Sequence, residues 1–143
     1  ALLVAVMEHA MEDLWWRSSA AAEGAGDDPV YRLAAQVECL ALYHARRQDL
    51  AFIAWSEIRS LTGEARAAHI GRRDRQQRVF DAILDDGTRT GSFSTPWPDE
   101  TSRAIVTLCT GVAQWYRSGG RHTPEEIAAR YVVLTRAMAQ AEQ

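Results

Sequence analysis

The apolar residues of this chain recur at every third or fourth position in nearly every segment. This spacing places them on one face of a helix, whereas the side chains of a half-buried strand alternate between apolar and polar. No stretch shows such an alternation, and the interruptions are rich in glycine, proline or small polar residues. The sequence therefore predicts an all-α protein.

Six segments carry the helical pattern, over residues 1–18, 28–47, 48–61, 64–90, 99–117 and 124–141. Two of them have clear start signals, because Asp28 and Thr123 are capping residues that are each followed by proline. Glu126 also stands three residues after Thr123, which is the spacing of a capping box. A chain of 143 residues can bury one core, so we expect a single domain over residues 1–143.

Charge and hydropathy exclude several classes of protein. No apolar run approaches the roughly 20 residues of a membrane span, and the apolar start of the chain is interrupted by Glu8 and lacks the basic residues of a signal peptide. We therefore expect a cytoplasmic protein without membrane contact. The net charge of −3 gives no overall attraction for nucleic acid. All basic residues are arginine, which excludes lysine-dependent phosphate loops and Schiff-base chemistry.

The sequence lacks the spacings that catalysis or metal binding would need. It contains no Glu-x-x-His, His-Glu-x-x-His, Cys-x-x-Cys, Gly-x-Ser-x-Gly or Gly-x-Gly-x-x-Gly pattern. Cys39 and Cys109 lie inside apolar helical stretches, which favours buried small side chains over a reactive sensor thiol. We expect neither an enzyme, nor a metal site, nor a bound cofactor.

A run of charges occupies the middle of the fourth segment, between Arg72 and Arg78. It is compatible with a solvated helix face, or with contact to an anionic ligand group such as a phosphorylated cofactor tail. Direct reading of DNA is disfavoured, because no helix-turn-helix context surrounds the run.

The last two segments are apolar on more than one side. The fifth adds a face of small residues to its apolar stripe, and the sixth adds Val132 and Val133 to its own. Such helices are buried on two sides, either at the centre of one core or in a four-helix interface between two copies. The residues that such an interface would use are Ala104, Thr107, Gly111, Ile127, Tyr131, Leu134 and Met138.

The stretch from Trp115 to Ala128 resembles the carboxy-terminal region of TetR-family transcriptional regulators. Its Trp-Tyr-Arg-Ser-Gly-Gly-Arg sequence is closest to an actinobacterial branch that often has proline where this chain has Ser118. Weaker similarities extend the resemblance over essentially the whole chain. They lie at His44, Asp49, Leu50, Glu57, Leu61, Gly87, Gly91, Phe93 and the segment 1–6.

This resemblance implies the ligand-sensing and dimerisation half of a repressor, with the six helices forming a TetR-type sensor bundle. The last two helices would form the four-helix interface of a homodimer, and the first would act as the lever toward DNA. The helix-turn-helix domain of the family is not in this sequence, so operator DNA would be contacted only through that absent part. A small molecule bound in the bundle would shift the dimer and release the operator.

The resemblance also implies an apolar pocket among the first five helices. Its predicted lining is Met7, Met11, Trp15, Leu40, Tyr43, His44, Phe52, Trp55, Phe80, Ile83, Cys109, Trp115 and Arg117. Two effector classes remain open: a neutral hydrophobic molecule, or an acyl-CoA-type thioester. The phosphates of such a thioester would be held by Arg72, Arg73, Arg75 or Arg78. The alternative is a helical dimerisation module without a small-molecule ligand.

Overall fold

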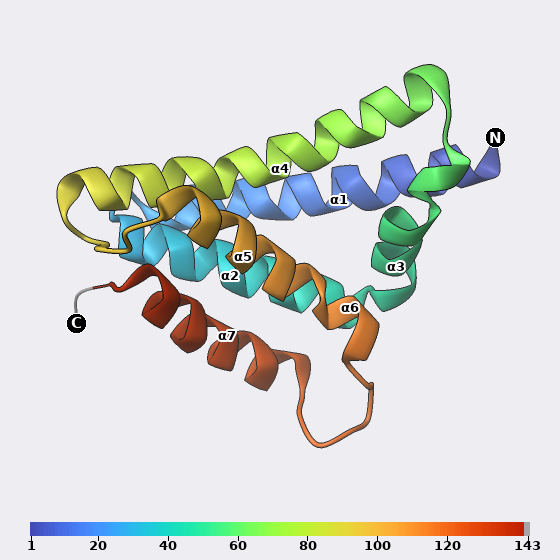
Figure 1. The fold of residues 1–143 in the computed structure, drawn as a ribbon. Helices are drawn as coiled ribbons and strands as arrows, with labels where there is room; N and C mark the ends of the chain where they lie inside the picture. The colour runs from blue at the N-terminus through green and yellow to red at the C-terminus, as the bar shows by residue number, and fades with distance from the viewer. Residues whose placement is uncertain (142–143) are drawn as a thin grey trace.

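The structure is a computed structural model that describes residues 1–141 as an all-α bundle (Figure 1). The helices are α1 Leu2–Ala25, α2 Pro29–Arg46, α3 Gln48–Ser56, the 3-10 helix η1 Glu57–Ser60, α4 Gly63–Thr90, α5 Pro98–Thr110, α6 Val112–Trp115 and α7 Pro124–Ala139. An isolated bridge between Phe93 and Ala141 is the only β-type pairing within these residues. The prediction of an all-α fold is confirmed.

The predicted starts of α2 and α7 are confirmed by their caps. The carboxylate of Asp28 accepts a hydrogen bond from the backbone N–H of Val30. Thr123 and Glu126 form the complete capping box at the start of α7. Each cap involves only residues within a few positions of the helix start, so the sequence alone was sufficient to predict it.

Two predicted helix ends were wrong. The first helix continues past Ser18 to Ala25, because alanine-rich sequence favours a helix and Ser18 is bonded to another helix instead of ending its own. The fifth predicted helix is divided into α5 and α6 at Gly111, and Tyr116 is already extended. The end of the third predicted helix is the 3-10 helix η1.

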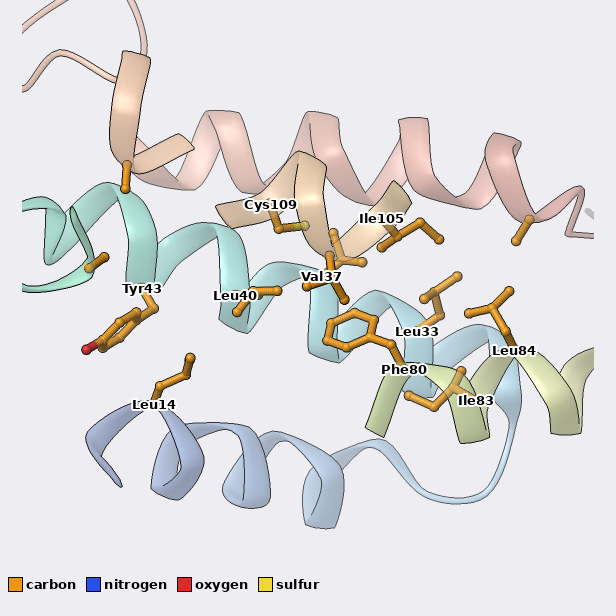
Figure 2. Packing of buried hydrophobic residues seen from close by; sticks show 14 of the residues in the cluster. Leu14, Leu33, Val37, Leu40, Tyr43, Phe80, Ile83, Leu84, Ile105 and Cys109 are labelled. Atoms are coloured by element: carbon orange, nitrogen blue, oxygen red, sulfur yellow. The ribbon is translucent and has the colours of Figure 1, made fainter. Parts of the chain in front are cut away.

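The core lies around α2, which packs against α1, α4, α5 and α7. The long helices α1 and α4 run side by side, while α7 lies across α2 from them (Figure 1). Figure 2 shows Leu33, Val37 and Leu40 of α2 meeting Phe80 of α4 and Ile105 of α5. This packing fixes the helices that surround the site described below.

A buried polar network joins α1, α2 and α4 at one end of that site. The hydroxyl of Ser18 donates to Oε1 of Gln36 over 2.8 Å, and Nε2 of Gln36 donates to the Ser18 carbonyl over 2.9 Å. Gln76 donates from Nε2 to the same hydroxyl over 3.2 Å. Because all three side chains are buried, their mutual bonds fix the relative position of the three helices.

The glycine pair of the family-like motif forms the turn before α7. Gly119 adopts a φ of 77°, a backbone conformation that favours glycine. The Tyr116 hydroxyl donates to the carbonyl of His122 over 3.0 Å, and Gln48 donates to the carbonyl of Tyr116. The motif therefore fastens the α6–α7 connection to the start of α3. None of the helices within residues 1–141 has the length and apolar character of a membrane span.

Candidate functional site

A cavity of about 570 Å³ lies among α1, α2, α3, α4 and α5. This volume falls within the range of small-molecule pockets, roughly 300 to 1,000 Å³. The residues around it are Ala10, Met11, Leu14, Leu40, Tyr43, His44, Ala51, Ala54, Trp55, Ile58, Arg66, Ile70, Arg73, Asp74, Gln76, Gln77, Arg103, Val106, Thr107 and Thr110.

The wall contributed by α1, α2, α3 and η1 is mainly apolar. Met11 and Leu14 face the cavity from α1, Leu40 from α2, Trp55 from α3 and Ile58 from η1. Met11 and Leu14 both face the cavity because residues three or four positions apart lie on one face of a helix. A methionine beside aromatic and branched side chains gives an adaptable apolar surface.

The wall from α4 and α5 is mainly polar. Arg66, Arg73 and Gln77 share one face of α4, since seven and four positions separate them. Arg103 and Thr110 line the cavity from α5, which packs against α4. The cavity is therefore two-sided, with hydrocarbon on one wall and cationic groups on the other.

Arg73 is held in place on the polar wall by an aromatic ring. Its guanidinium carbon lies 3.7 Å from the centroid of the Trp55 ring, which is a cation–π contact. Burial lowers the pKa of Arg73, while neighbouring Asp74 opposes that effect. The side chain thus crosses from α4 to α3 and presents a partly desolvated positive charge at the cavity.

His44 supplies a neutral imidazole. Its Nδ1–H donates to the carbonyl of Leu40 over 2.8 Å, which leaves Nε2 as a hydrogen-bond acceptor. Burial lowers the pKa of His44 to about 4, so the ring is uncharged at neutral pH. Beside it, the Tyr43 hydroxyl donates to the Ala10 carbonyl over 2.8 Å, and burial raises the pKa of Tyr43 to about 12.

His69 does not line the cavity but joins two of the helices that do. Its Nε2–H donates to the carbonyl of Ala54 over 2.9 Å, which ties α4 to the part of α3 that lines the cavity. Nδ1 has no partner within the described residues, although the side chain is buried. Burial is the main cause that lowers the pKa of His69, and the nearby Arg73 and Arg72 lower it further.

Five of the thirteen predicted pocket residues line the cavity: Met11, Leu40, Tyr43, His44 and Trp55. The other eight do not line this cavity. Met7, Phe80, Ile83 and Cys109 are buried in the protein core, away from the cavity wall. Trp15 lies beneath the guanidinium of Arg75, while Phe52, Trp115 and Arg117 are exposed on the surface.

The arginine run is divided between structural contacts and the cavity. Arg72 and Arg75 both form ion pairs with Glu12 of α1, and Arg78 is exposed away from the cavity. Only Arg73 of that run faces the cavity, so the other three are not placed to hold a phosphate group there. The sequence prediction missed Arg66 and Arg103; the seven-residue spacing from Arg66 to Arg73 was the available signal.

The predicted dimer face is partly used inside the protomer. Ile127 is buried against Val112 and Tyr116 and so does not lie on an exposed face, whereas Thr107 lines the cavity and is also exposed. The remaining members lie on α5 and α7, which pack against each other, or at Gly111 where α5 ends. Ala104 and Leu134 are exposed, while Gly111, Tyr131 and Met138 are partly buried.

A second, shallower hollow of about 770 Å³ lies beside the glycine pair, and its cationic groups are already paired. Arg46 forms an ion pair with Glu125, and Arg47 with Asp13. Its lining includes Leu50 and Tyr116 but is otherwise made of small or polar residues. The cavity among α1 to α5 is therefore the better candidate for a ligand site.

Comparison with known proteins places this fold. The family described as the tetracyclin repressor-like C-terminal domain matches residues 26–139. No curated protein sequence gives a significant match. A TetR-family regulatory protein from Rhodococcus RHA1 is 27% identical with a TM-score of 0.91, covering 99% of this chain and 74% of its own.

Two further solved structures have the same fold. The TetR-family regulator PfmR from Thermus thermophilus is 26% identical, with a TM-score of 0.84 and coverage of 99% and 75%. AibR, solved with isovaleryl coenzyme A and operator DNA, is 21% identical, with a TM-score of 0.85 and the same coverage. Because the family match spans most of the sequence, this chain belongs to the tetracyclin repressor-like C-terminal domain family of TetR-type transcriptional regulators.

Proposed function

We propose that this chain is the ligand-sensing and homodimerisation domain of a TetR-family repressor. A small hydrophobic or acyl-CoA-type effector would occupy the cavity and thereby release operator DNA. The observation that carries the proposal is the cavity of about 570 Å³, which has one apolar wall and reaches five helices. AibR, which shares the fold, is known in complex with an acyl-coenzyme A, and this supports the class of effector.

The dimer would form through the outer face of α5 and α7. Leu134 and Val133 are 52% and 68% exposed on α7, and Ala104 adds a small side chain on α5. Exposed apolar side chains on adjacent helices favour contact with another apolar surface. A second copy of the chain would bring two such helix pairs together as a four-helix interface.

Helix α1 would carry the signal from the cavity toward a DNA-reading domain joined to its N-terminal end. Met11 and Leu14 face the cavity, so a ligand that displaces them moves α1. On the neighbouring face, Glu12 holds α1 against Arg72 and Arg75 of α4. A shift in this contact would change the spacing of the two heads in the dimer.

Thermal unfolding of the purified chain with a panel of hydrophobic alcohols and acyl-CoA thioesters tests ligand sensing. A ligand at a hundred times its Kd should stabilise the native state by about 2.7 kcal/mol. Thr110→Trp places a large ring at the cavity wall and should abolish this gain. Ala82→Trp, on the exposed surface of α4, is the matched control and should retain it.

The competing function is a dimerisation module without a ligand, which the apolar face of α5 and α7 would support by itself. In that case the panel would not raise the unfolding temperature, and Thr110→Trp would behave like Ala82→Trp. A dimer with that behaviour would favour the module over the sensor.

A further inference from the structure

Seven arginines outside the cavity have an acidic partner, whereas the three on the cavity wall have none within residues 1–141. The surface arginines Arg59, Arg78, Arg117, Arg121 and Arg130 also lack one in this range, but they do not converge on the cavity. Ion pairs with aspartate or glutamate engage Arg17, Arg32, Arg46, Arg47, Arg72, Arg75 and Arg89. Arg66, Arg73 and Arg103 make no salt bridge within residues 1–141, although all three line the same cavity. The cavity thus gathers unpaired guanidinium groups in a chain whose overall charge is negative.

The charge of the cavity wall is mainly positive. Asp74 is its one acidic side chain, set against Arg66, Arg73 and Arg103. Arg73 is also partly desolvated, and although Asp74 lies nearby, no salt bridge within residues 1–141 offsets the cost of burying its charge. A bound anion would offset that cost, and the guanidinium group forms strong paired hydrogen bonds with carboxylates and phosphates.

The arrangement of the two walls limits the rest of the ligand. The arginines lie on α4 and α5, whereas Met11, Leu14 and other apolar side chains face them from α1, α2, α3 and η1. A molecule with an anionic group on one side and hydrocarbon on the other would match both walls. Arg73 is already oriented by its stacking on Trp55, which reduces the entropy lost on binding.

We propose that the cavity selects amphipathic anions, with Arg66, Arg73 and Arg103 binding the anionic group and the α1–α3 wall binding the hydrocarbon. This inference rests on the proposed sensing function and specifies its effector class. The anion has two possible sources: the carboxylate of a free acid, or the phosphates of an acyl thioester. Arg66 and Arg103 take the role that the sequence had assigned to Arg72, Arg75 and Arg78.

Isothermal titration with three ligands of equal chain length tests the inference. Decanoate, decanoyl-CoA and the neutral decanol share their hydrocarbon and differ in charge. We expect at least one of the two anions to bind about tenfold or more tightly than decanol, which corresponds to roughly 1.4 kcal/mol. This difference should shrink as salt is raised, because the site is open to solvent ions.

The variant Arg103→Gln separates charge from shape. Arg103 is exposed and has no salt bridge to lose, so the unfolding temperature should remain unchanged. Its affinity for the preferred anion should fall about tenfold, whereas decanol binding should not change. Arg78→Gln, outside the cavity on α4, is the control and should bind every ligand as the parent chain does.

The ligands also distinguish the two sources of the anion. Preference for decanoate assigns the arginines to a carboxylate, and preference for decanoyl-CoA assigns them to phosphates. Equal binding of decanol and both anions would overturn the inference while leaving a sensor of neutral molecules. If none of the three bound, the inference would also be wrong, and the proposed function would fail only if the wider thermal panel gave no stabilisation.

Discussion

Gly87 has less room for a side chain than any other glycine within residues 1–141. A Cβ atom built there would lie 2.1 Å from the ring of Phe93, which is buried and hydrogen-bonded through its backbone N–H to the Gly87 carbonyl. We expect Gly87→Ala to lower the free energy of unfolding by about 2 kcal/mol, because the ring must move from a packed core. Urea denaturation would measure the change.

Gly71, in the same helix, is the matched control for this substitution. No atom lies within 4 Å of a Cβ built there, and the residue is exposed. Gly71→Ala should therefore stabilise the protein by about 0.5 to 1 kcal/mol, since alanine favours the helix. Equal effects of the two substitutions would contradict the role assigned to the Gly87–Phe93 contact.

His44 should make the stability of the protein depend on pH. Its pKa is lowered to about 4 in the folded chain, so the unfolded chain takes up its proton first as the pH falls. The resulting stability is complete above the unfolded pKa near 6.5 and is lost as the pH falls toward 4. Its full size is about 3 kcal/mol.

The variant His44→Leu isolates this contribution. The Leu40 carbonyl that His44 contacts also belongs to the backbone of α2, so leucine leaves no buried polar group unpaired. Between pH 6.5 and 4, the variant should lose about 3 kcal/mol less stability than the parent chain. His9→Gln, on the exposed surface of α1, should follow the parent curve; parallel curves for all three proteins would refute the assignment.

At the scale of elements, α7 and α4 begin in contrasting ways. Thr123 accepts a hydrogen bond from the backbone N–H of Glu126 at the start of α7, whereas Thr62 makes no side-chain cap at the start of α4. Thr123→Ala should cost about 1 kcal/mol of unfolding free energy, and Thr62→Ala much less. Circular dichroism during thermal unfolding compares them, and equal losses would show that the Thr123 cap contributes nothing.

Local signals in the sequence predicted where helices start, whereas the end of α1 depends on tertiary contacts. Asp28 and Thr123 predicted the starts of α2 and α7, because a capping side chain bonds to backbone groups only two or three residues away. The end of α1 was missed because Ser18 is a turn-forming residue by sequence, yet its partners Gln36 and Gln76 are distant in the chain.

The cavity was predicted less completely than the helices. Periodicity shows which face of a helix is apolar but not how deeply it is buried, so Phe80 and Ile83 were expected at the cavity and lie in the core. Leu40 and His44 belong to a similar stripe and do face the cavity. Whether an apolar residue lines the cavity or lies in the core depends on how the five helices pack together. The sequence pattern of a single helix does not predict that packing.

For the whole molecule, we predict a dimer held by α5 and α7. Leu134→Arg would place a charge in the apolar face, and light scattering coupled to size exclusion should then give the mass of a monomer. Ala82→Arg changes an exposed residue on α4, outside the α5–α7 pair, and should leave the dimer intact. A parent chain that is already monomeric, or a Leu134→Arg dimer, would remove α7 from the interface.

Native mass spectrometry of the purified chain tests sensing and dimerisation together. Under gentle conditions we predict a dimer that carries a co-purified small molecule or takes up an added amphipathic anion. Denaturing conditions would then release the bound compound and give its mass. A monomer that remains empty in the presence of decanoate, decanoyl-CoA and decanol would contradict the account.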